Sequence, residues 1–152
     1  MKRAIHIVLA ITIGFSVLSS TNAQQTETLT VTYPTTGERV GGQLIARGVA
    51  EIPPGKHLWV LARRVDFGPL WWPQRQARVD PIRHEWEAQA VLGGPQDIGW
   101  EFDIGAAIVD RKAHDELMDY WTKAMQTGDW RPISLPDGVS KLETVTVSKS
   151  RQ

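Results

Sequence analysis

The chain has 152 residues, and its 17 lysine and arginine residues balance its 17 aspartate and glutamate residues. This length suits one domain that buries its own core, and the absence of cysteine from the sequence excludes disulfides and thiol catalysis. The basic residues form no long run, so the sequence lacks the basic footprint on which non-specific nucleic-acid binding depends.

The N-terminal segment has the pattern of a secretory signal peptide. A basic start precedes an apolar run over residues 4–18, and small residues ending at Ala23 suit cleavage before Gln24. The run is short for a bilayer span and polar residues follow it, which favours cleavage over the alternative of a retained anchor. We therefore expect a signal peptide over residues 1–23 and an exported, periplasmic or secreted domain over residues 24–152, with no stable membrane span after cleavage.

Alternating apolar and polar residues predict that the next part of the chain forms β-strands. The first three predicted strands are residues 28–33, 43–51 and 57–65. Gly48 within the second marks a bulge or a close approach of two backbones. The third is apolar on both faces, with Trp59 and Leu61 opposite Leu58 and Val60, which is typical of a central strand covered on both sides.

The stretch FGPLWWPQ is predicted to be a loop, because glycine and proline residues flank the adjacent Trp71 and Trp72. Neighbouring side chains of an extended segment leave on opposite sides. We therefore expect one indole to face the body of the domain and the other to face outward, near Arg75 and near Arg63 or Arg64.

The rest of the chain alternates again and then changes to helical spacing. The remaining predicted elements are an edge segment over residues 76–82, strands over residues 84–92, 100–109 and 141–149, and a helix over residues 111–127 before the last strand. Asp110 suits the N-cap of this helix, and Gly128 suits its end. We expect the helix to cap one end or one edge of the domain.

Six or seven strands at hairpin-like intervals and one late helix predict a mainly β fold, an antiparallel β-sandwich with Greek-key connections. The segments TYP, ARGVAEIPPGKHLWVLARR, LGGPQDIG, FDIGAAIVD and VTVSK resemble immunoglobulin-like or fibronectin-III-like modules of bacterial exported proteins. The resemblance implies a single immunoglobulin-like sandwich, in which Trp59 stands at the position of the strand-C core tryptophan, although both core cysteines of antibody domains are missing. Such sandwiches host many roles, so the resemblance implies no catalytic residue.

The histidines and serines of the predicted domain do not form a catalytic or metal-binding pattern. His57, His84 and His114 have no metal-ligand spacing, and His114 is expected on the polar side of the helix. No serine lies in a G-x-S-x-G motif. The sequence therefore predicts no catalytic residue, no metal and no cofactor.

Carboxylate pairs leave one enzymatic alternative open. Glu85 with Glu87, and Glu101 with Asp103, lie two residues apart on predicted strands. Glycoside hydrolysis uses two carboxylates, but alternation alone already places polar residues on the solvated outer faces of strands. We interpret both pairs as such outer faces, and a hydrolase with loop carboxylates is the least favoured function.

The tryptophans divide into two groups by their predicted elements. Those at inward positions are expected in the core: Trp59, Trp86, Trp100 and Trp121. Those in predicted loops, together with nearby arginines, are the candidate contact residues for a ligand or partner: Trp71, Trp72, Trp130, Arg64 and Arg75. Indoles beside arginine and glutamine side chains can stack on a sugar ring or anchor a protein interface, and filling a gap in the fold is the alternative.

The sequence thus predicts an exported, non-catalytic binding or protein-interaction module whose partner is a protein or a glycan and not nucleic acid. A small carbohydrate-binding module that uses the loop of Trp71 and Trp72 is the alternative. The buried or exposed position of these two indoles distinguishes a contact surface from a structural plug.

Overall fold

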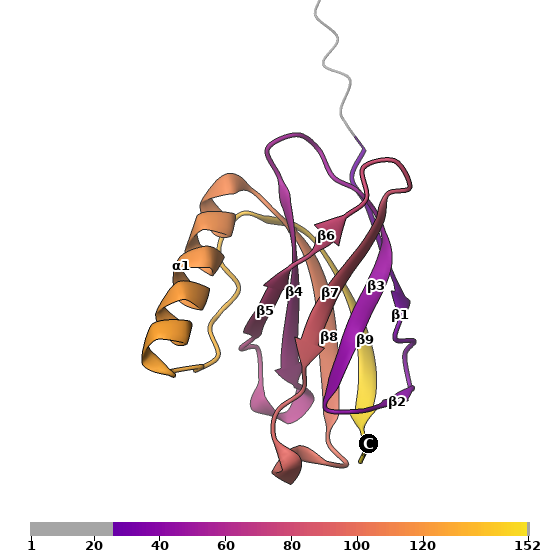
Figure 1. The fold of residues 1–152 in the computed structure, drawn as a ribbon, viewed down its shortest axis with the longest axis vertical. Coiled ribbons are helices and arrows are strands. Elements are labelled where there is room, and N and C mark those ends of the chain that lie inside the picture. The colour runs from indigo at the N-terminus through magenta and orange to yellow at the C-terminus, as the bar shows by residue number, and fades with distance from the viewer. Residues whose placement is uncertain (1–25, 152) are drawn as a thin grey trace, which may run out of the picture.

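The computed structural model describes residues 26–151, which form two packed β-sheets and one α-helix before the last strand (Figure 1). The four-stranded sheet has the order β1 (Thr28–Tyr33), β3 (Gln43–Glu51), β7 (Glu85–Val91) and β6 (Arg78–Val79). The five-stranded sheet has the order β2 (Arg39–Val40), β9 (Val139–Lys149), β8 (Glu101–Val109), β4 (His57–Arg64) and β5 (Trp72–Gln76). The predicted signal peptide and its cleavage site lie outside the described residues.

Neighbouring described strands are antiparallel, except that β2 and β9 run parallel. Two single-turn 3-10 helices, η1 (Val65–Phe67) and η2 (Pro95–Asp97), lie in the β4–β5 and β7–β8 connections. The α-helix, α1 (Arg111–Thr127), joins β8 to β9. Within the described part of the chain, no helix combines the length and the apolarity needed to cross a membrane.

Local signals account for most elements. The six long strands predicted from alternation are confirmed, with small differences at their ends. The predicted helix is confirmed at both ends: the Asp110 side chain accepts a hydrogen bond from the Ala113 N–H at 2.8 Å, and Gly128 ends the helix in the left-handed conformation with φ 74°. A capping carboxylate and a left-handed glycine satisfy the free backbone groups of the first and last turns.

The predicted loop at FGPLWWPQ is corrected in part. Trp72 begins β5, which pairs with β4 at the edge of the five-stranded sheet. Leu61 lies opposite Pro73 and Val60 lies opposite Arg75, so Gln74 is an extra residue that bulges from the ladder. An edge strand with a bulge tolerates proline, which is why the breaker residues here do not end the strand.

The main core lies between the two sheets. Its largest side chain is the indole of Trp86, and aliphatic residues such as Leu58, Val60 and Ile104 surround it. The close approach expected at Gly48 is confirmed. A Cβ atom at this position would lie 1.9 Å from the Thr30 carbonyl oxygen and 2.6 Å from the Trp86 ring. Any larger residue at this position would push β1 and β7 apart.

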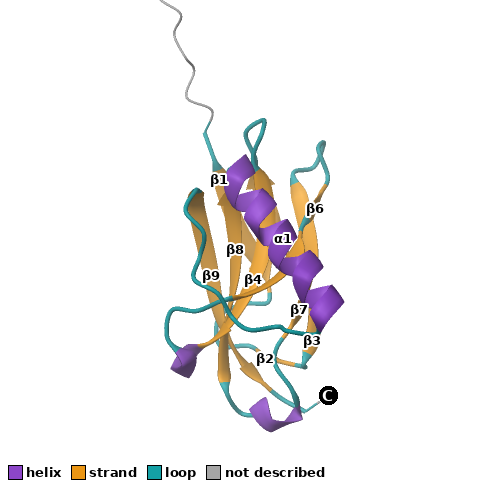
Figure 2. Cartoon of the chain, turned by 90° about the vertical axis from the view of Figure 1, so that its left-hand side faces the viewer, coloured by secondary structure: helices purple, strands orange, loops and turns teal. Residues whose placement is uncertain are grey.

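A second core lies on the opposite face of the five-stranded sheet, beneath α1 (Figure 2). Trp59 and Leu61 pack there against Ala113 and Leu117 of the helix. The expectation that β4 is covered on both sides is therefore confirmed. The helix covers a sheet face instead of capping an end or an edge, and Trp59 lies under the helix instead of between the sheets, unlike the strand-C tryptophan position that the resemblance implies.

Three further expectations are corrected. Trp100 is 45% exposed, because β8 begins only at Glu101 and Trp100 still belongs to the preceding turn. His114 does not face solvent on the polar side of the helix; its ring stacks on His57 at 3.7 Å and accepts the Trp59 indole N–H at 3.0 Å. Asp103 is buried rather than solvated.

Asp103 is buried because β8 is covered on both faces and its carboxylate has partners there. It accepts hydrogen bonds from Arg63 Nε at 2.8 Å and from Thr146 Oγ1 at 2.6 Å. Glu85 and Glu87, by contrast, are exposed as expected, and they face Arg83 and Arg47. Of the four carboxylates in the two pairs, Asp103 is therefore the buried one.

Candidate functional site

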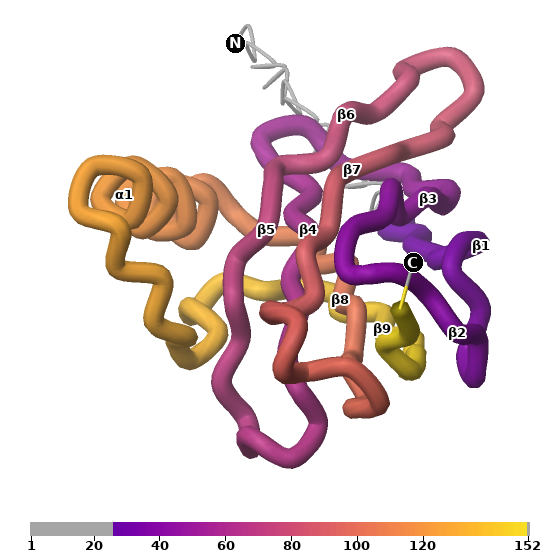
Figure 3. The backbone as a smooth tube through the Cα atoms, turned by 60° about the horizontal axis from the view of Figure 1, so that its bottom comes forward, coloured from indigo at the N-terminus to yellow at the C-terminus, as the bar shows by residue number. Residues whose placement is uncertain are grey.

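A groove of about 760 Å³ opens along one side of the sandwich between β5 and β7. The chain leaves the five-stranded sheet after Gln76 and enters the other sheet at Arg78, so β5 and β7 lie side by side below this crossing (Figure 3). Its aromatic lining residues are Phe67, Trp72, Phe102, Trp121 and Trp130. Its polar and charged lining residues are Arg64, Gln74, Arg75, Gln89, Gln96 and Asp97.

The two adjacent tryptophans separate at this groove, as the sequence analysis expected. Trp71 is 3% exposed and packs into the second core, with the Arg63 guanidinium 4.7 Å from the centre of its ring. Its backbone exchanges two hydrogen bonds of 2.8 Å with Ile133, which fixes its direction. Trp72 points the other way and lines the groove. Trp71 is therefore a structural residue, and Trp72 is the member of the pair that a ligand could contact.

The wall formed by Trp72 is held in place by its neighbours. The indole N–H of Trp72 donates to the Trp130 carbonyl at 2.7 Å, and the Phe67 ring meets the Trp72 ring edge-on at 5.8 Å. These contacts leave the indole half-buried. A fixed aromatic surface of this kind costs little conformational entropy when a ligand binds to it.

The opposite wall comes from the C-terminal half of α1 and the loop after it. Trp121 donates its indole N–H to the Gln74 carbonyl of β5 at 2.6 Å. Trp130 lies nearly perpendicular to Trp121, with 5.7 Å between the ring centres. The guanidinium of Arg75 lies 4.0 Å over the Trp121 ring. The bulge at Gln74 thus gives the helix a carbonyl to bind and turns β5 into one edge of the groove.

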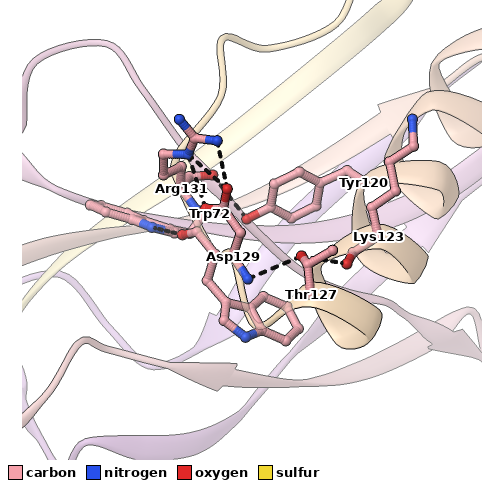
Figure 4. A network of polar contacts seen from close by, with 7 residues as sticks. Trp72, Tyr120, Lys123, Thr127, Asp129 and Arg131 are labelled. Carbon is pink, nitrogen blue, oxygen red and sulfur yellow. Dashed lines mark hydrogen bonds and ion pairs between the residues drawn. The ribbon is translucent and has the colours of Figure 1, made fainter.

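The loop that carries Trp130 is tied to the end of α1 (Figure 4). The Tyr120 hydroxyl donates to the Arg131 carbonyl at 3.1 Å, and the Asp129 N–H donates to Thr127 Oγ1 at 3.2 Å. Asp129 and Arg131 form an ion pair, and the Arg131 guanidinium lowers the pKa of the Asp129 carboxyl. These bonds position Trp130 even though its indole is 41% exposed.

A charged cluster closes one end of the groove. Arg64 binds Asp66 and Asp97, each with a shortest distance of 2.7 Å, and its guanidinium lies between the rings of Phe67 and Trp100 at 4.1 Å and 4.6 Å. The hydrogen bonds from Arg64 hold the pKa of the Asp66 carboxyl below its usual range. Because both carboxylates and both aromatic faces are engaged, Arg64 serves to fix the η1 and η2 connections.

The amide side chains provide the uncharged polar groups of the site. Gln74 Oε1 accepts the Val91 N–H at 2.8 Å, so this side chain bridges β5 and β7. Gln89 and Gln96 also line the groove. Amides both donate and accept hydrogen bonds, which suits a ligand with several hydroxyl or amide groups.

Four of the five contact residues expected from the sequence line this one groove: Trp72, Trp130, Arg64 and Arg75. Trp71 does not. The sequence analysis noted glutamines beside the tryptophan pair but did not identify Phe67, Trp121, Gln89 or Gln96 as contact residues. Phe67 stands beside the tryptophan pair in the same stretch and could have been included, whereas Trp121 and Gln89 reach the groove only through the packing of α1 and β7.

Comparison with known proteins adds no further assignment: no protein-family model matches the chain, and a search of curated proteins finds no similar sequence. Among residues 26–151, no three histidine, cysteine, aspartate or glutamate side chains gather so as to hold a metal ion. The groove is therefore the feature of the molecule from which a function is inferred.

Proposed function

We propose that this chain is an exported, non-catalytic binding module and that the groove between β5 and β7 is its ligand site. The observation that carries the proposal is the convergence of Trp72, Trp121 and Trp130 around one concave space. Sites for small ligands are concave, mostly apolar and furnished with a few oriented polar groups. The aromatic walls and the glutamines of this groove match that description.

The lining residues support binding without catalysis. Among the described residues that line the groove there is no serine, threonine, cysteine or histidine to serve as a nucleophile or a base. The lining carboxylate, Asp97, is buried and accepts hydrogen bonds from Arg64 and from the Gly94 N–H at 2.7 Å each. Both oxygens of this carboxylate are thus engaged by donors, which leaves it poorly placed to serve as a general acid or base.

We infer that the ligand is a short oligosaccharide. A sugar ring offers an apolar face to an indole and a rim of hydroxyls to amides, and both kinds of group line the groove. A protein partner is the second candidate, since tryptophan and arginine are also the usual anchors of protein interfaces. Partner binding by strand addition at β5 receives less support, because the Trp121 indole already occupies the Gln74 carbonyl at this edge.

We also infer that the sandwich is immunoglobulin-like. The N-terminal region divides between the sheets, with β1 beside β3 and β2 beside β9, and the chain crosses back from β5 to β6. These features, together with the two sheet orders, support the resemblance drawn from the sequence. The helix over the outer face of β4 and β8 is an addition to a minimal sandwich.

Export is proposed from the sequence pattern over residues 1–23. Mass spectrometry of the protein from its native host should find a mature N-terminus near Gln24 in a soluble extracytoplasmic fraction. A chain that starts at Met1 and fractionates with membranes would contradict this part of the proposal.

The binding proposal is tested by Trp72→Ala and by Tyr33→Ala as a matched control. Both are partly exposed aromatic residues on strands, but Tyr33 lies on β1, away from the groove. Each variant is melted first and then screened on a glycan array and in a pull-down from a native extract. Trp72→Ala should lose glycan retention while Tyr33→Ala keeps it, since an aromatic anchor can contribute about 2 kcal/mol or more. Retention that survives in a folded Trp72→Ala protein would reject the groove as the site.

A further inference from the structure

The charged side chains that line the groove differ in whether they already have a partner. Three charged side chains line it: Arg64, Arg75 and Asp97. The two arginines differ in their partners, and this difference indicates what kind of ligand the groove accepts. This inference rests on the proposed function, because it takes the groove as the ligand site.

Arg64 is already paired with two carboxylates. Its Nε and Nη2 bind the two oxygens of Asp66, and its Nη1 binds Asp97. Two carboxylates therefore more than offset the charge of this guanidinium, and one of them, Asp66, binds it in the bidentate manner. A ligand carboxylate would have to displace one of them, and in the case of Asp97 it would leave a buried charge unpaired.

Arg75 is in the opposite state. Among the described residues, no carboxylate lies within ion-pair distance of it, and its guanidinium stacks on the face of Trp121. A guanidinium that stacks on a ring keeps the N–H groups of its edge free for a planar anion. The stacking also restricts the side chain to the mouth of the groove, so little conformational freedom is lost on pairing.

A second cation lies behind the same end of the groove as Arg64. Lys149 is 5% exposed, and its ammonium donates to the carbonyl of Gly94, a residue of the lining. No described carboxylate lies within ion-pair distance of Lys149 either. Within the described residues of the groove and its wall, the three cations Arg64, Arg75 and Lys149 thus face the two carboxylates Asp66 and Asp97, which leaves one positive charge in excess. Of the two lining arginines, Arg75 is the one without a carboxylate partner. This arrangement favours an anionic ligand over a neutral or cationic one.

We propose that the groove binds an acidic oligosaccharide, with a uronate carboxylate paired to the edge of Arg75 and a sugar ring against Trp72 or Trp130. Carboxylate matches the planar fork of the guanidinium, and the aromatic walls and glutamines meet the ring and its hydroxyls. Arg75 is a specificity residue in this arrangement, because it selects for charge while the tryptophans hold the ring.

The test compares acids with their esters. Trimers of galacturonate, mannuronate and glucuronate, each beside its methyl ester, are titrated against the mature chain by calorimetry at low and at high salt. At least one acid should bind about 10-fold or more tightly than its ester, as expected for a hydrogen-bonded charge pair. That preference should shrink at high salt, because salt screens an exposed pair.

Two arginine variants assign the preference to a residue. Arg75→Gln should abolish the difference between acid and ester. Arg78→Gln is the matched control, because Arg78 is also exposed, lies three positions along the chain in β6 and is not part of the lining. It should keep the difference unchanged. Circular dichroism and thermal melting confirm that both variants are folded.

The outcomes separate this inference from the function on which it rests. Esters or neutral glycans that bind as tightly as acids through Trp72, or an acid preference that survives Arg75→Gln, would overturn the charge selection and leave the binding module standing. A protein that retains no glycan of either kind would overturn both. Capture of a protein partner through Trp72 with no uronate binding would replace the glycan by the second candidate.

Discussion

Two regions built from tryptophan lie on either side of β5, and they differ in whether the chain fills the space beside the rings. In the first region, under the N-terminal half of α1, Trp59 and Trp71 pack in one buried cluster with Ala113 and Leu117. Both indoles are almost fully buried. Here large aromatic residues complete a core in a domain that has no disulfide to stabilise it.

In the second region, beside the C-terminal half of α1, Trp72, Trp121 and Trp130 surround the groove. Their indole N–H groups or rings are tied to neighbours, yet the space between them is open. The comparison teaches that the residue type alone does not decide a role. A tryptophan is structural where the helix covers it, and it is a candidate contact residue where it lines the open groove.

The adjacent tryptophans give the largest expected contrast between the regions. Trp71→Ala removes a buried indole and should lower the free energy of unfolding by about 3–5 kcal/mol. Trp72→Ala removes a half-buried ring and one hydrogen bond and should cost roughly 1 kcal/mol. Urea titration of both variants measures the difference. Equal losses would mean that the groove wall is as much a part of the core as Trp71.

Acid should weaken the covered region before the open one. Desolvation and then the neighbouring charge of His57 lower the pKa of His114, with Arg111 adding to this effect and Asp115 opposing it. The unfolded chain therefore binds this proton more readily than the folded chain. The stability that depends on neutral His114 is present above about pH 6.5 and is lost as the pH falls through the lower folded-state pKa.

This pH dependence is measured as the unfolding free energy between pH 7.5 and pH 5. His114→Gln should flatten the profile, because it removes the group whose protonation breaks the Trp59 hydrogen bond. His84→Asn is the control: His84 is exposed, and asparagine tolerates its positive φ of 58°. If His84→Asn, and not His114→Gln, removes the pH dependence of the unfolding free energy, the assignment of this dependence to His114 is wrong.

Trp100→Ala should have the smallest effect on stability. The ring is 45% exposed and its described contact is with Arg64, which keeps Phe67, Asp66 and Asp97 as partners. We expect a loss of about 0.5 kcal/mol in a thermal or urea melt, as for an ordinary surface substitution. A loss as large as that of Trp71→Ala would show that the aromatic stack at Arg64 holds the end of the sandwich together.

Much of the fold could be predicted from the sequence, because alternation, the Asp110 cap and the left-handed Gly128 are local signals. β5 could not, since its edge position and its bulge at Gln74 make a strand compatible with proline. The prediction that Trp100 points into the core was wrong because Trp100 precedes the first residue of β8, and the alternation of side chains applies only within a strand. The predicted position of His114 on the polar side of the helix was wrong because its partners, Trp59 and His57, come from a strand that is distant in the sequence.

The candidate site was predictable only as a set of loop aromatics and arginines. Trp72, Arg75 and Trp130 share a groove because α1 folds back over the sheet and places Trp121 against the Gln74 carbonyl. That packing depends on contacts between residues far apart in the sequence. The different states of the two arginines depend likewise on Asp97, which reaches Arg64 from the β7–β8 connection.

The central claim, that the groove is the ligand site, is tested most directly by comparing Trp130→Ala with Trp100→Ala in equilibrium glycan binding. The two indoles are similarly exposed, at 41% and 45%, but Trp130 lines the groove and Trp100 does not. We predict that Trp130→Ala lowers the affinity for the glycan retained by the unmodified chain by roughly 10-fold or more, and that Trp100→Ala leaves it within about 2-fold. Equal affinities for the two variants, or a loss confined to Trp100→Ala, would contradict the account.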